Sequence, residues 1–329
     1  MSPIATGNGA YVIHRHLEKR IKGYDVLPYH PFRTLAPPSL WPLGRKLKPS
    51  IIHTTPDYAF FHKQKNVPLV LTFHNYVLDA YMRQYSSTLQ NIHYQTDLKW
   101  FTKKAVNLAS EITAVSEFTA KLAQQELGLN RDVRVIYNGV DETIFTPVNK
   151  TRESKLVVLF SGNLSSRKGA QWLIPILDKL AQNVSIRYTS GLRGSGELPK
   201  HPRLENVGRV AYKDMASLYQ SSDVLLFPTV REGFGLAAAE AMACGLPVVA
   251  TNCSALTELI DDGKGGFLCG LGDVGDFADK INQLADNESL RKEMGEYNRE
   301  KVERLFTLEK MVCGYKDLFQ EVLDRTNAQ

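Results

Sequence analysis

The chain has 329 residues, of which 43% are hydrophobic and 23% charged, and its formal net charge is +5 at pH 7. This length suggests two domains, and the composition is that of an ordinary globular protein with apolar material for two cores. No run approaches ~18 uncharged apolar residues, so we expect no transmembrane helix, and the start lacks the features of a signal peptide. The four cysteines are widely spaced without a C-x-x-C pair, so we expect a cytoplasmic protein without zinc or disulfides.

Positive charge is concentrated in the first half of the chain. Residues 1–150 contain 18 Lys and Arg against 11 Asp and Glu, together with seven of the eight histidines. A mildly basic, solvated surface explains this imbalance as well as a surface that meets an anionic partner, such as a membrane or an acidic acceptor. Nucleic acid is not expected, because no dense Lys/Arg stripe with interleaved aromatic residues is present.

Short apolar runs alternate with amphipathic segments along the whole chain, which indicates α/β layers. A first helix is expected over residues 8–23, with Gly23 as its stop, and a second helix begins after Ser116 and ends at Gly128. Residues 33–49 form a proline-broken loop with exposed apolar and basic side chains. The buried strands predicted in this half cover residues 50–55, 68–75, 111–116 and 133–139.

A polar segment with a proline, residues 145–155, is expected to link the two domains. The second half then predicts another doubly wound sheet, with helices between its strands. Those strands cover residues 156–163, 184–191, 206–210, 223–228, 247–251 and 266–270. The tail, residues 306–325, is a long amphipathic helix. Its apolar stripe consists of Leu308, Val312, Tyr315, Phe319 and Val322.

The segment "REGFGLAAAEAMACGLPVVAT" places one glutamate in a loop after a strand and a second glutamate in an alanine-rich helix. In an open parallel sheet, ligands bind beyond the carboxyl ends of strands, where helix N-termini favour phosphate. The loop frees Glu232 from the helix, so that both Glu232 and Glu240 can reach one ligand, and carboxylates are good partners for sugar hydroxyls. The alternative is that Glu232 is a solvated charge and Glu240 a surface residue. The backbone groups expected at the phosphate belong to Gly233, Phe234, Gly235 and Leu236.

Three further stretches have the form of a ligand site. Arg167 and Lys168 end a loop between a strand and a helix, where two cations can clamp a diphosphate or simply be solvated. Gly7 and Gly9, in "TGNG" ahead of a helix, form another phosphate-type loop, which is weak evidence alone. His74 ends an apolar strand, where a histidine is as often structural as functional.

Together these stretches strongly resemble the family-4 retaining glycosyltransferases, which have the GT-B architecture. "EGFGLAAAE" matches the E-x7-E signature of that family, and "VRVIYNGVDETIF" is similar to its NGVD element. "ITAVSEFTA", "NVGRV", "SSDVLLFPTVREGFG" and "AMACGLPVVATNCSALTELIDDGKGGFL" also match, in the order of the family. The resemblance covers nearly the whole chain and is densest from residue 156 to residue 270.

The resemblance implies an α/β fold with two Rossmann-like domains that face each other across a cleft. Residues 1–147 would form the acceptor-side domain, residues 148–305 the nucleotide-sugar domain, and residues 306–329 a helix that packs back on the first domain. Such enzymes transfer a sugar with retention and need no metal, and the absence of a D-x-D motif agrees with this. UDP is favoured as the nucleotide by family frequency, and GDP remains open.

The resemblance also implies a role for individual residues. Glu232 matches the glutamate that touches the donor sugar and Glu240 the one that binds the ribose, while Gly235 and its neighbours match the phosphate turn. Lys168 matches the diphosphate lysine, and Val210 falls where backbone groups meet the base. Among the residues of the first domain, those that match the reaction centre and the glycine loop facing the donor are His74, Gly7 and Gly9.

Two departures from the family pattern stand out. Asn163 occupies the position where the family usually has an arginine of the diphosphate clamp, and Arg167 is a candidate to replace it. Only five residues precede the glycine loop, where the family has a full strand. We interpret Ile4 and Ala5 as the remnant of that strand and expect the natural chain to start further upstream, which the genomic frame before Met1 tests.

The sequence therefore predicts a cytoplasmic, metal-independent glycosyltransferase with Glu232, Lys168 and His74 in its catalytic site and no bound cofactor. The expected partners are a nucleotide-sugar donor and a glycan or lipid-linked acceptor, with loops 40–49 and 81–87 mixing aromatic and basic residues that suit an anionic membrane. Ordinary loops beside a soluble acceptor remain the alternative. Two other functions stay open, a sugar-nucleotide epimerase and a sugar-nucleotide-binding protein without catalysis.

Overall fold

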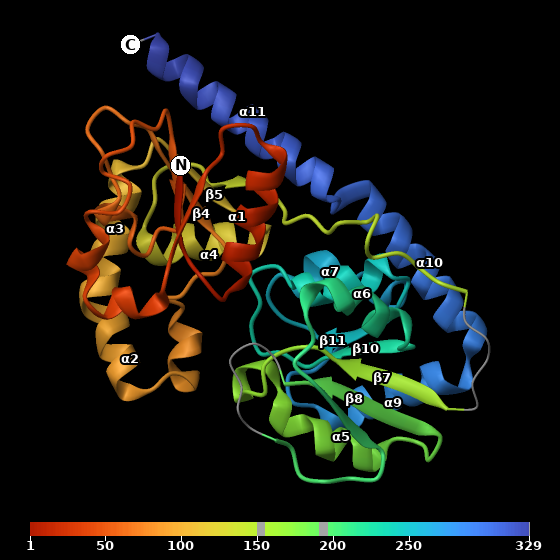
Figure 1. Ribbon diagram of the computed structural model, residues 1–329. Coiled ribbons are helices and arrows are strands. Elements are labelled where there is room, and N and C mark those ends of the chain that lie inside the picture. The colour runs from red at the N-terminus through yellow and green to blue at the C-terminus, as the bar shows by residue number, and fades with distance from the viewer. Residues whose placement is uncertain (150–154, 191–196, 329) are drawn as a thin grey trace. The chain divides into compact units, whose positions relative to one another are not determined.

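The computed structural model describes residues 1–149, 155–190 and 197–328 (Figure 1). The chain divides into two compact units, Met1–Gly139 with Leu308–Gln329, and Val140–Thr307. The sequence places these divisions at residues 147 and 305, and its linker, residues 145–155, lies partly outside the described residues. The tail helix that the sequence predicts belongs to the same unit as the first 139 residues.

The first unit is built on short parallel strands in two sheets. One sheet pairs β1 (Ser2–Ala5) with β2 (Val26–Tyr29), and the other has the order β3-β4-β5-β6. These four strands are Ile52–Thr54, Leu69–Phe73, Glu111–Ala114 and Arg134–Val135. Each predicted strand is present, but shorter than its apolar run, because only part of each run pairs with a neighbouring strand. The sequence did not predict β2, which contains Pro28; a proline lacks the N–H donor that an interior strand needs.

Strand β1 is hydrogen-bonded on both of its sides. It pairs with β2 in parallel register from Ser2 opposite Val26. On its other side the His53 N–H donates to the Met1 carbonyl over 3.0 Å, and the Thr54 hydroxyl donates to the Pro3 carbonyl over 2.5 Å. The short segment before the glycine loop is thus a strand that leaves no unpaired edge between β2 and β3.

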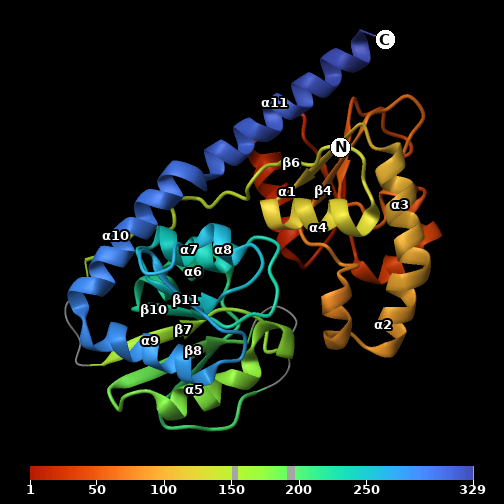
Figure 2. The same ribbon diagram turned by 180° about the vertical axis from the view of Figure 1, so that it is seen from behind.

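Helices cover both faces of the β3–β6 sheet (Figures 1 and 2). On one face α3 and α4 pack against alternate strand residues, including Leu71, Phe73 and Ile112, in one apolar cluster. On the other face α1 and α11 lie against residues of the opposite pleat. The helices of this unit are α1 (Gly9–Arg20), α2 (Thr88–His93), α3 (Lys99–Leu108), α4 (Glu117–Leu127) and α11 (Leu308–Asn327), with 3-10 turns in the predicted loop at Pro31–Leu35 and Pro37–Leu40.

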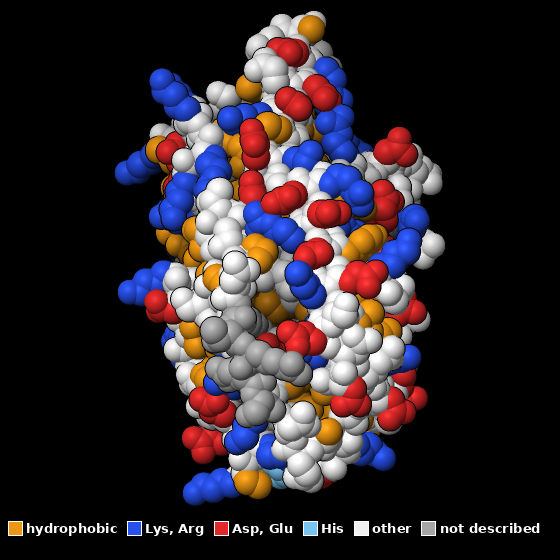
Figure 3. Space-filling view, turned by 90° about the vertical axis from the view of Figure 1, so that its right-hand side faces the viewer, with side chains coloured by type: hydrophobic (Ala, Val, Ile, Leu, Met, Phe, Trp, Pro, Cys, Tyr) orange, Lys and Arg blue, Asp and Glu red, His pale blue; other side chains and the backbone are white. Residues whose placement is uncertain are grey.

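The tail helix α11 buries one apolar stripe and pairs its polar side with the sheet. Arg134 of β6 donates to Glu321 over 2.7 Å, and Arg325 donates to Glu111 of β5 over 2.6 Å. Figure 3 shows acidic and basic side chains interspersed on the face that it draws. The buried stripe consists of Leu308, Met311, Val312, Tyr315, Leu318 and Val322, while Phe319 of the predicted stripe is half-buried.

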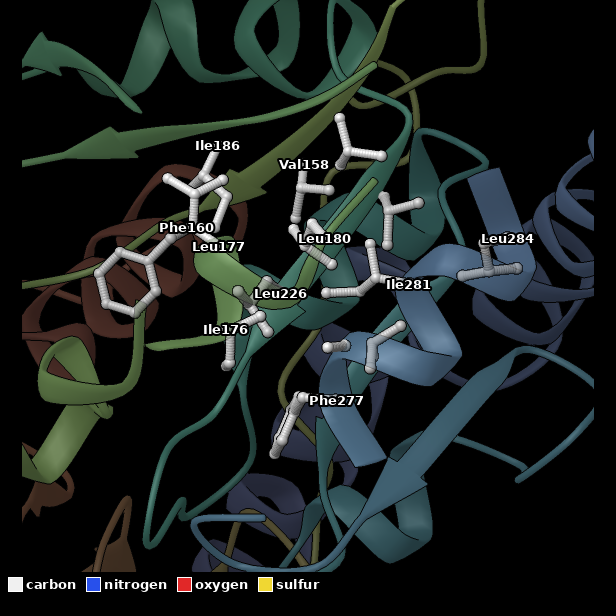
Figure 4. Close-up of a cluster of buried hydrophobic side chains, with 14 of the residues drawn as sticks. Val158, Phe160, Ile176, Leu177, Leu180, Ile186, Leu226, Phe277, Ile281 and Leu284 are labelled. Carbon is white, nitrogen blue, oxygen red and sulfur yellow. The ribbon is translucent and has the colours of Figure 1, made fainter. Parts of the chain in front are cut away.

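The second unit contains one parallel sheet of six strands with the order β12-β11-β10-β7-β8-β9. Its apolar centre joins strand side chains such as Val158 and Leu226 to Leu177 of α5 (Leu173–Lys179) and to Phe277 and Ile281 of α9 (Val274–Asp286) (Figure 4). All six strands were predicted. They are β7 (Leu156–Phe160), β8 (Val184–Thr189), β9 (Leu204–Gly208), β10 (Val224–Phe227), β11 (Val248–Thr251) and β12 (Gly266–Cys269).

The helices of the second unit are α5 (Leu173–Lys179), α6 (Tyr212–Gln220), α7 (Leu236–Ala243), α8 (Leu256–Leu259), α9 (Val274–Asp286) and α10 (Glu288–Leu305). Two short 3-10 turns, Ser166–Lys168 and Ala170–Trp172, precede α5. Within the described ranges, none of the helices combines the length and the apolar composition needed to cross a membrane.

Candidate active site

The strand order of the second unit reverses between β7 and β10, which makes a topological switch point there. After β7 the chain proceeds outward through β8 and β9, and it then returns to β10 on the other side of β7. The connections that leave β7 and β10 therefore diverge, and such a switch point is where open parallel sheets bind ligands. The loop after β7 holds Lys168, and the loop after β10 holds Glu232. These residues, 64 positions apart, therefore meet at the carboxyl ends of the two strands.

Lys168 and Glu232 form an ion pair at this edge. The Lys168 ammonium donates to Oε1 of Glu232, and both side chains are mostly shielded, with 26% and 13% of their surfaces exposed. Oε1 of Glu232 also accepts from the Thr229 hydroxyl over 3.1 Å, and the Glu232 N–H donates to the Ser254 hydroxyl over 3.0 Å. The Glu232 carboxylate is thus held by two partners, Lys168 and Thr229, and its backbone is held by Ser254.

The two loops are held together by backbone contacts. The Arg167 carbonyl accepts from the Val230 N–H over 3.0 Å and from the Thr229 hydroxyl over 3.1 Å. Gly169 has φ +79°, and a Cβ at this position would lie 2.2 Å from the Pro228 carbonyl oxygen. Only glycine fits this close approach, so Gly169 sets the position of Lys168 against the end of β10.

The helix α7 begins with bare backbone at the same edge. Its N-cap is Gly235, with φ +99° and no side-chain cap, and a Cβ there would lie 3.1 Å from Leu256. The first amides of a helix have no partner within the helix and carry its positive dipole end. The start of α7, at Leu236, therefore offers a small anion-binding surface beside the Lys168–Glu232 pair.

Glu240 lies one turn further along α7 and faces α6. Its Oε2 accepts from the Tyr219 hydroxyl over 3.0 Å, and that hydroxyl lies 3.4 Å from the Ser161 hydroxyl after β7. Burial raises the pKa of Glu240 to about 7, while the Tyr219 hydrogen bond works in the opposite direction. Glu240 is therefore not an exposed surface charge. It is a desolvated carboxyl held by an aromatic hydroxyl.

We expect this carboxyl to lower stability as pH rises. Because the pKa of Glu240 is raised in the folded state, the native protein holds a proton between pH 4.5 and 7 that the unfolded chain releases, and the free energy of unfolding falls across this window. Glu240→Gln should flatten the profile between pH 4.5 and 7, measured by urea unfolding. Glu293→Gln, on the exposed side of α10, should keep the wild-type slope. Equal slopes for both variants would contradict the burial of the Glu240 charge.

The remaining residues predicted for the donor site are less closely joined. Arg167 lies beside Lys168, and its buried Nε has no partner among the described residues. Asn163 lies in the loop after β7, where its carbonyl accepts from the Ser165 N–H over 2.9 Å. Val210 follows β9, which is two strands from β7 at the edge of the sheet. The structure thus gathers Lys168, Glu232 and Glu240 in one unit and places Val210 further along the same sheet.

The residues predicted in the first unit lie after its strands. Gly7, with φ +77°, and Gly9 form the turn from β1 into α1, where Asn8 caps the helix by accepting from the Tyr11 N–H over 2.8 Å. His74 directly follows β4, and its Nε2 lies 3.1 Å from Nε2 of His14 on α1. Burial lowers the pKa of His74 to about 3, so this ring is neutral.

Sequence reasoning missed the side chains that hold these groups. Thr229 and Ser254 bond Glu232, Tyr219 bonds Glu240, and His14 contacts His74. A hydroxyl residue after a buried strand is a usable signal for Thr229. The others lie 21 to 60 residues away from their partners, and no local spacing indicates them.

Comparisons with known proteins identify the family. Residues 155–287 match the family described as "Glycosyl transferases group 1", and residues 6–143 match "Glycosyltransferase Family 4". The chain belongs to the family-4 glycosyltransferases. Its activity class is therefore glycosyl transfer, and its fold is GT-B.

Among three curated relatives of this glycosyltransferase, two are named for an activity, and these two activities differ. It is 26% identical to the N-acetyl-alpha-D-glucosaminyl L-malate synthase of Bacillus anthracis over 93% of this chain and 84% of the relative. It is 31% identical to a glycosyltransferase of Methanocaldococcus jannaschii over 69% of this chain and 64% of the relative. A D-inositol 3-phosphate glycosyltransferase of Paenarthrobacter aurescens is 30% identical over 59% and 53%. This chain thus spans about half to four fifths of these relatives.

Solved structures share its fold. The sucrose-phosphate synthase of Thermosynechococcus elongatus superposes with a TM-score of 0.83 at 18% identity, over 99% of this chain and 100% of that one. HepE of Anabaena, solved with UDP-glucose, superposes with a TM-score of 0.74 at 20% identity over the full length of both chains. At this identity the likeness establishes the GT-B fold of the family-4 glycosyltransferase and leaves its substrates to be argued from its own site.

Proposed function

We propose that this glycosyltransferase moves a sugar from a nucleoside diphosphate to a hydroxyl of a glycan or lipid-linked acceptor, with retention of configuration. The observation that carries the proposal is the meeting of Lys168 and Glu232 at the start of α7. A cation and a helix N-terminus suit a diphosphate, and an adjacent carboxylate suits sugar hydroxyls.

The proposed donor mode divides these groups by chemistry. The diphosphate binds the α7 amides, and Lys168 leaves Glu232 to pair with it. Arg167 is the second cation. It takes the role of the family's clamp arginine, whose position Asn163 occupies in this chain. Glu232 then bonds the transferred sugar. Glu240, held by Tyr219, bonds the ribose, and backbone near Val210 meets the base. UDP is the proposed nucleotide, which is supported by the UDP complexes among the structures of similar fold.

The proposed mechanism is electrostatic. Negative charge grows on the leaving diphosphate, and Lys168 with the α7 amides stabilises it from preorganised positions. We propose transfer on the face from which the diphosphate leaves, without a glycosyl-enzyme intermediate. The Thr229 hydroxyl supports this, because in the proposed donor mode it keeps its hydrogen bond to Oε1 of Glu232 while the same carboxylate bonds sugar hydroxyls, and a carboxylate with these partners is a weak nucleophile. His74, at the end of β4, is the proposed contributor from the first unit.

No metal is required in this mechanism, because the cations of the protein neutralise the diphosphate. One experiment tests the donor, the metal and the reaction together. UDP, GDP and ADP sugars are compared by thermal shift, since a ligand raises the unfolding temperature by mass action. The tightest donor is then assayed with and without EDTA, and product anomers are assigned by NMR.

We expect the largest shift with a UDP sugar, transfer unchanged by EDTA, and product with the donor configuration. A product with the inverted configuration would contradict the retaining mechanism. Loss of turnover in EDTA would contradict metal independence. Conversion of donor without any acceptor would instead indicate the epimerase. UDP binding without sugar release would indicate the binding protein that Asn163 leaves open.

We also propose that the first unit contacts an anionic membrane at its cytoplasmic face. The 3-10 turn Pro31–Leu35 exposes Phe32 by 74% and Leu35 by 83%. In the predicted loop 40–49, Trp41 is 51% exposed, and the Arg45 guanidinium lies 5.2 Å from its ring centroid. Apolar side chains flanked by basic ones suit the interface of an anionic bilayer.

Co-sedimentation with liposomes tests this contact. We expect binding to vesicles that contain anionic lipid, and the double variant Phe32→Ser with Leu35→Ser should weaken it by about tenfold or more, since each buried apolar side chain contributes about 1.5–3 kcal/mol. Leu271→Ser, an exposed leucine of the second unit, should bind as the wild type does. Equal sedimentation with neutral and anionic vesicles, or of all variants, would remove the proposal.

A further inference from the structure

A row of buried polar side chains crosses one face of the first unit's sheets. Ser2 of β1, His53 of β3, Thr72 of β4 and Thr113 of β5 all lie on the face that α1 and α11 cover, and each is at most 1% exposed. His14 of α1 is fully buried above them. Burying so many polar groups is costly unless each is hydrogen-bonded, so their bonds form a connected network.

His74 joins this network through His14. The two Nε2 atoms lie 3.1 Å apart, and the ring planes are inclined by 54° with centroids 5.2 Å apart. Two ring nitrogens in this contact share one proton, so one ring donates and the other accepts. Burial lowers the pKa of both histidines, so both rings are neutral.

The far end of the network sets the direction of donation. The Thr113 hydroxyl donates to the Leu71 carbonyl over 3.2 Å, so it accepts from the Thr72 hydroxyl over 2.7 Å. Thr72 then accepts from Nε2–H of His53 over 2.7 Å. With its proton on Nε2, His53 presents a lone pair at Nδ1, and the Tyr24 hydroxyl donates to it over 2.6 Å.

The same logic extends from Tyr24 to His74. The Tyr24 oxygen lies 2.8 Å from Nδ1 of His14, and the Ser2 hydroxyl oxygen lies 2.6 Å from the same nitrogen. Because Tyr24 donates its only hydroxyl proton to His53, its contact with His14 is a hydrogen bond when Nδ1 of His14 carries a proton. Nε2 of His14 is then the acceptor, and His74 donates to it. Nδ1 of His74 is buried and has no partner among the described residues.

We propose that His14 is a positioning residue that fixes the ring of His74 with its proton on Nε2, which leaves the Nδ1 lone pair to accept a hydrogen bond from a substrate hydroxyl. This inference rests on the proposed function, in which His74 contributes to transfer. It gives His74 a defined chemical character, because a ring held this way offers an acceptor at Nδ1 and no donor there.

Ring nitrogen NMR tests the inference without any substrate. In protein labelled with ¹⁵N-histidine, the His74 signals are assigned by their loss in His74→Gln. We expect the correlation pattern of a neutral ring protonated at Nε2. A proton on Nδ1 would overturn the inference, and this outcome needs no variant of His14 to fold.

A pair of matched variants then tests the role of His14. His14→Gln retains an oxygen acceptor for His74, whereas His14→Met has a similar length and no such acceptor. We expect the wild-type His74 pattern in the Gln variant and a mixture of both neutral tautomers in the Met variant. Tyr315→Phe removes a hydroxyl that lies 3.3 Å from Thr72 at the far end of the network, and it should leave the His74 pattern unchanged.

The rate of transfer should follow the ring state. His14→Met should lower kcat by about 10²-fold with an unchanged KM for the donor, which is the scale of a misplaced reacting group, and His14→Gln should restore most of it. A wild-type pattern and rate in His14→Met would refute the inference. If His74→Gln also transfers at the wild-type rate, the proposed role of His74 fails, and the ring pattern still decides whether His14 positions it.

Discussion

Lys168→Ala should lower kcat/KM for transfer by about 30- to 10³-fold, a loss of ~2–4 kcal/mol of transition-state stabilisation. The physical reason is the place of Lys168, whose ammonium lies against Glu232 at the start of α7, beside the proposed diphosphate site. Without the Lys168 ammonium, the negative charge that develops on the leaving diphosphate in the transition state is less stabilised. Initial rates at varied donor concentration measure the effect.

The matched control is Lys179→Ala, which removes the same charge from the exposed end of α5. It should leave kcat/KM unchanged. Lys168→Arg should recover part of the loss, because the guanidinium keeps the charge but not the compact shape. A Lys168→Ala enzyme that turns over like Lys179→Ala would show that the Lys168–Glu232 pair is only structural.

Gly169→Ala should destabilise the second unit by about 3 kcal/mol or more. The added Cβ meets the Pro228 carbonyl oxygen at 2.2 Å, in a backbone conformation with φ +79° that side chains rarely adopt. Left-handed strain costs about 1–3 kcal/mol, and an overpacked contact costs a similar amount again. The loop with Lys168 must also move away from β10, so transfer should fall as well.

Unfolding of this unit can be followed with one tryptophan. Trp172 packs against the core of the second unit, so Trp41→Phe and Trp100→Phe give a background in which fluorescence reports that unit alone. Gly263→Ala is the control, because its φ of +74° is similar and a Cβ there meets nothing within 4 Å. We expect only the strain of the conformation, about 1–2 kcal/mol. Equal losses for Gly169→Ala and Gly263→Ala would show that the contact with Pro228 relaxes freely.

The sequence by itself determined the α/β class, nearly all strands and the loops that carry the site. Apolar runs bounded by glycine and proline are local signals, and so are Ser116 as a helix cap and Gly128 as a helix stop, because each acts within one turn of chain. The confirmed family identification rests on the same kind of local motif, since "EGFGLAAAE" has its spacing set by one loop and one helix. β2 was missed because Pro28 removes the local strand signal, although an edge strand tolerates it.

Only the tertiary structure decided which side chains meet. Lys168 reaches Glu232 because β10 returns beside β7, and that adjacency depends on the crossover order of the sheet, which no window of sequence contains. Glu240 became a desolvated carboxyl with a raised pKa because α6 packs against α7, where Tyr219 bonds it. His74 gained a defined partner because α1 lies over the face of the sheet. Spacing along the chain fixes an element and its own faces, whereas a site needs the packing of several elements, and that packing is set by the whole core.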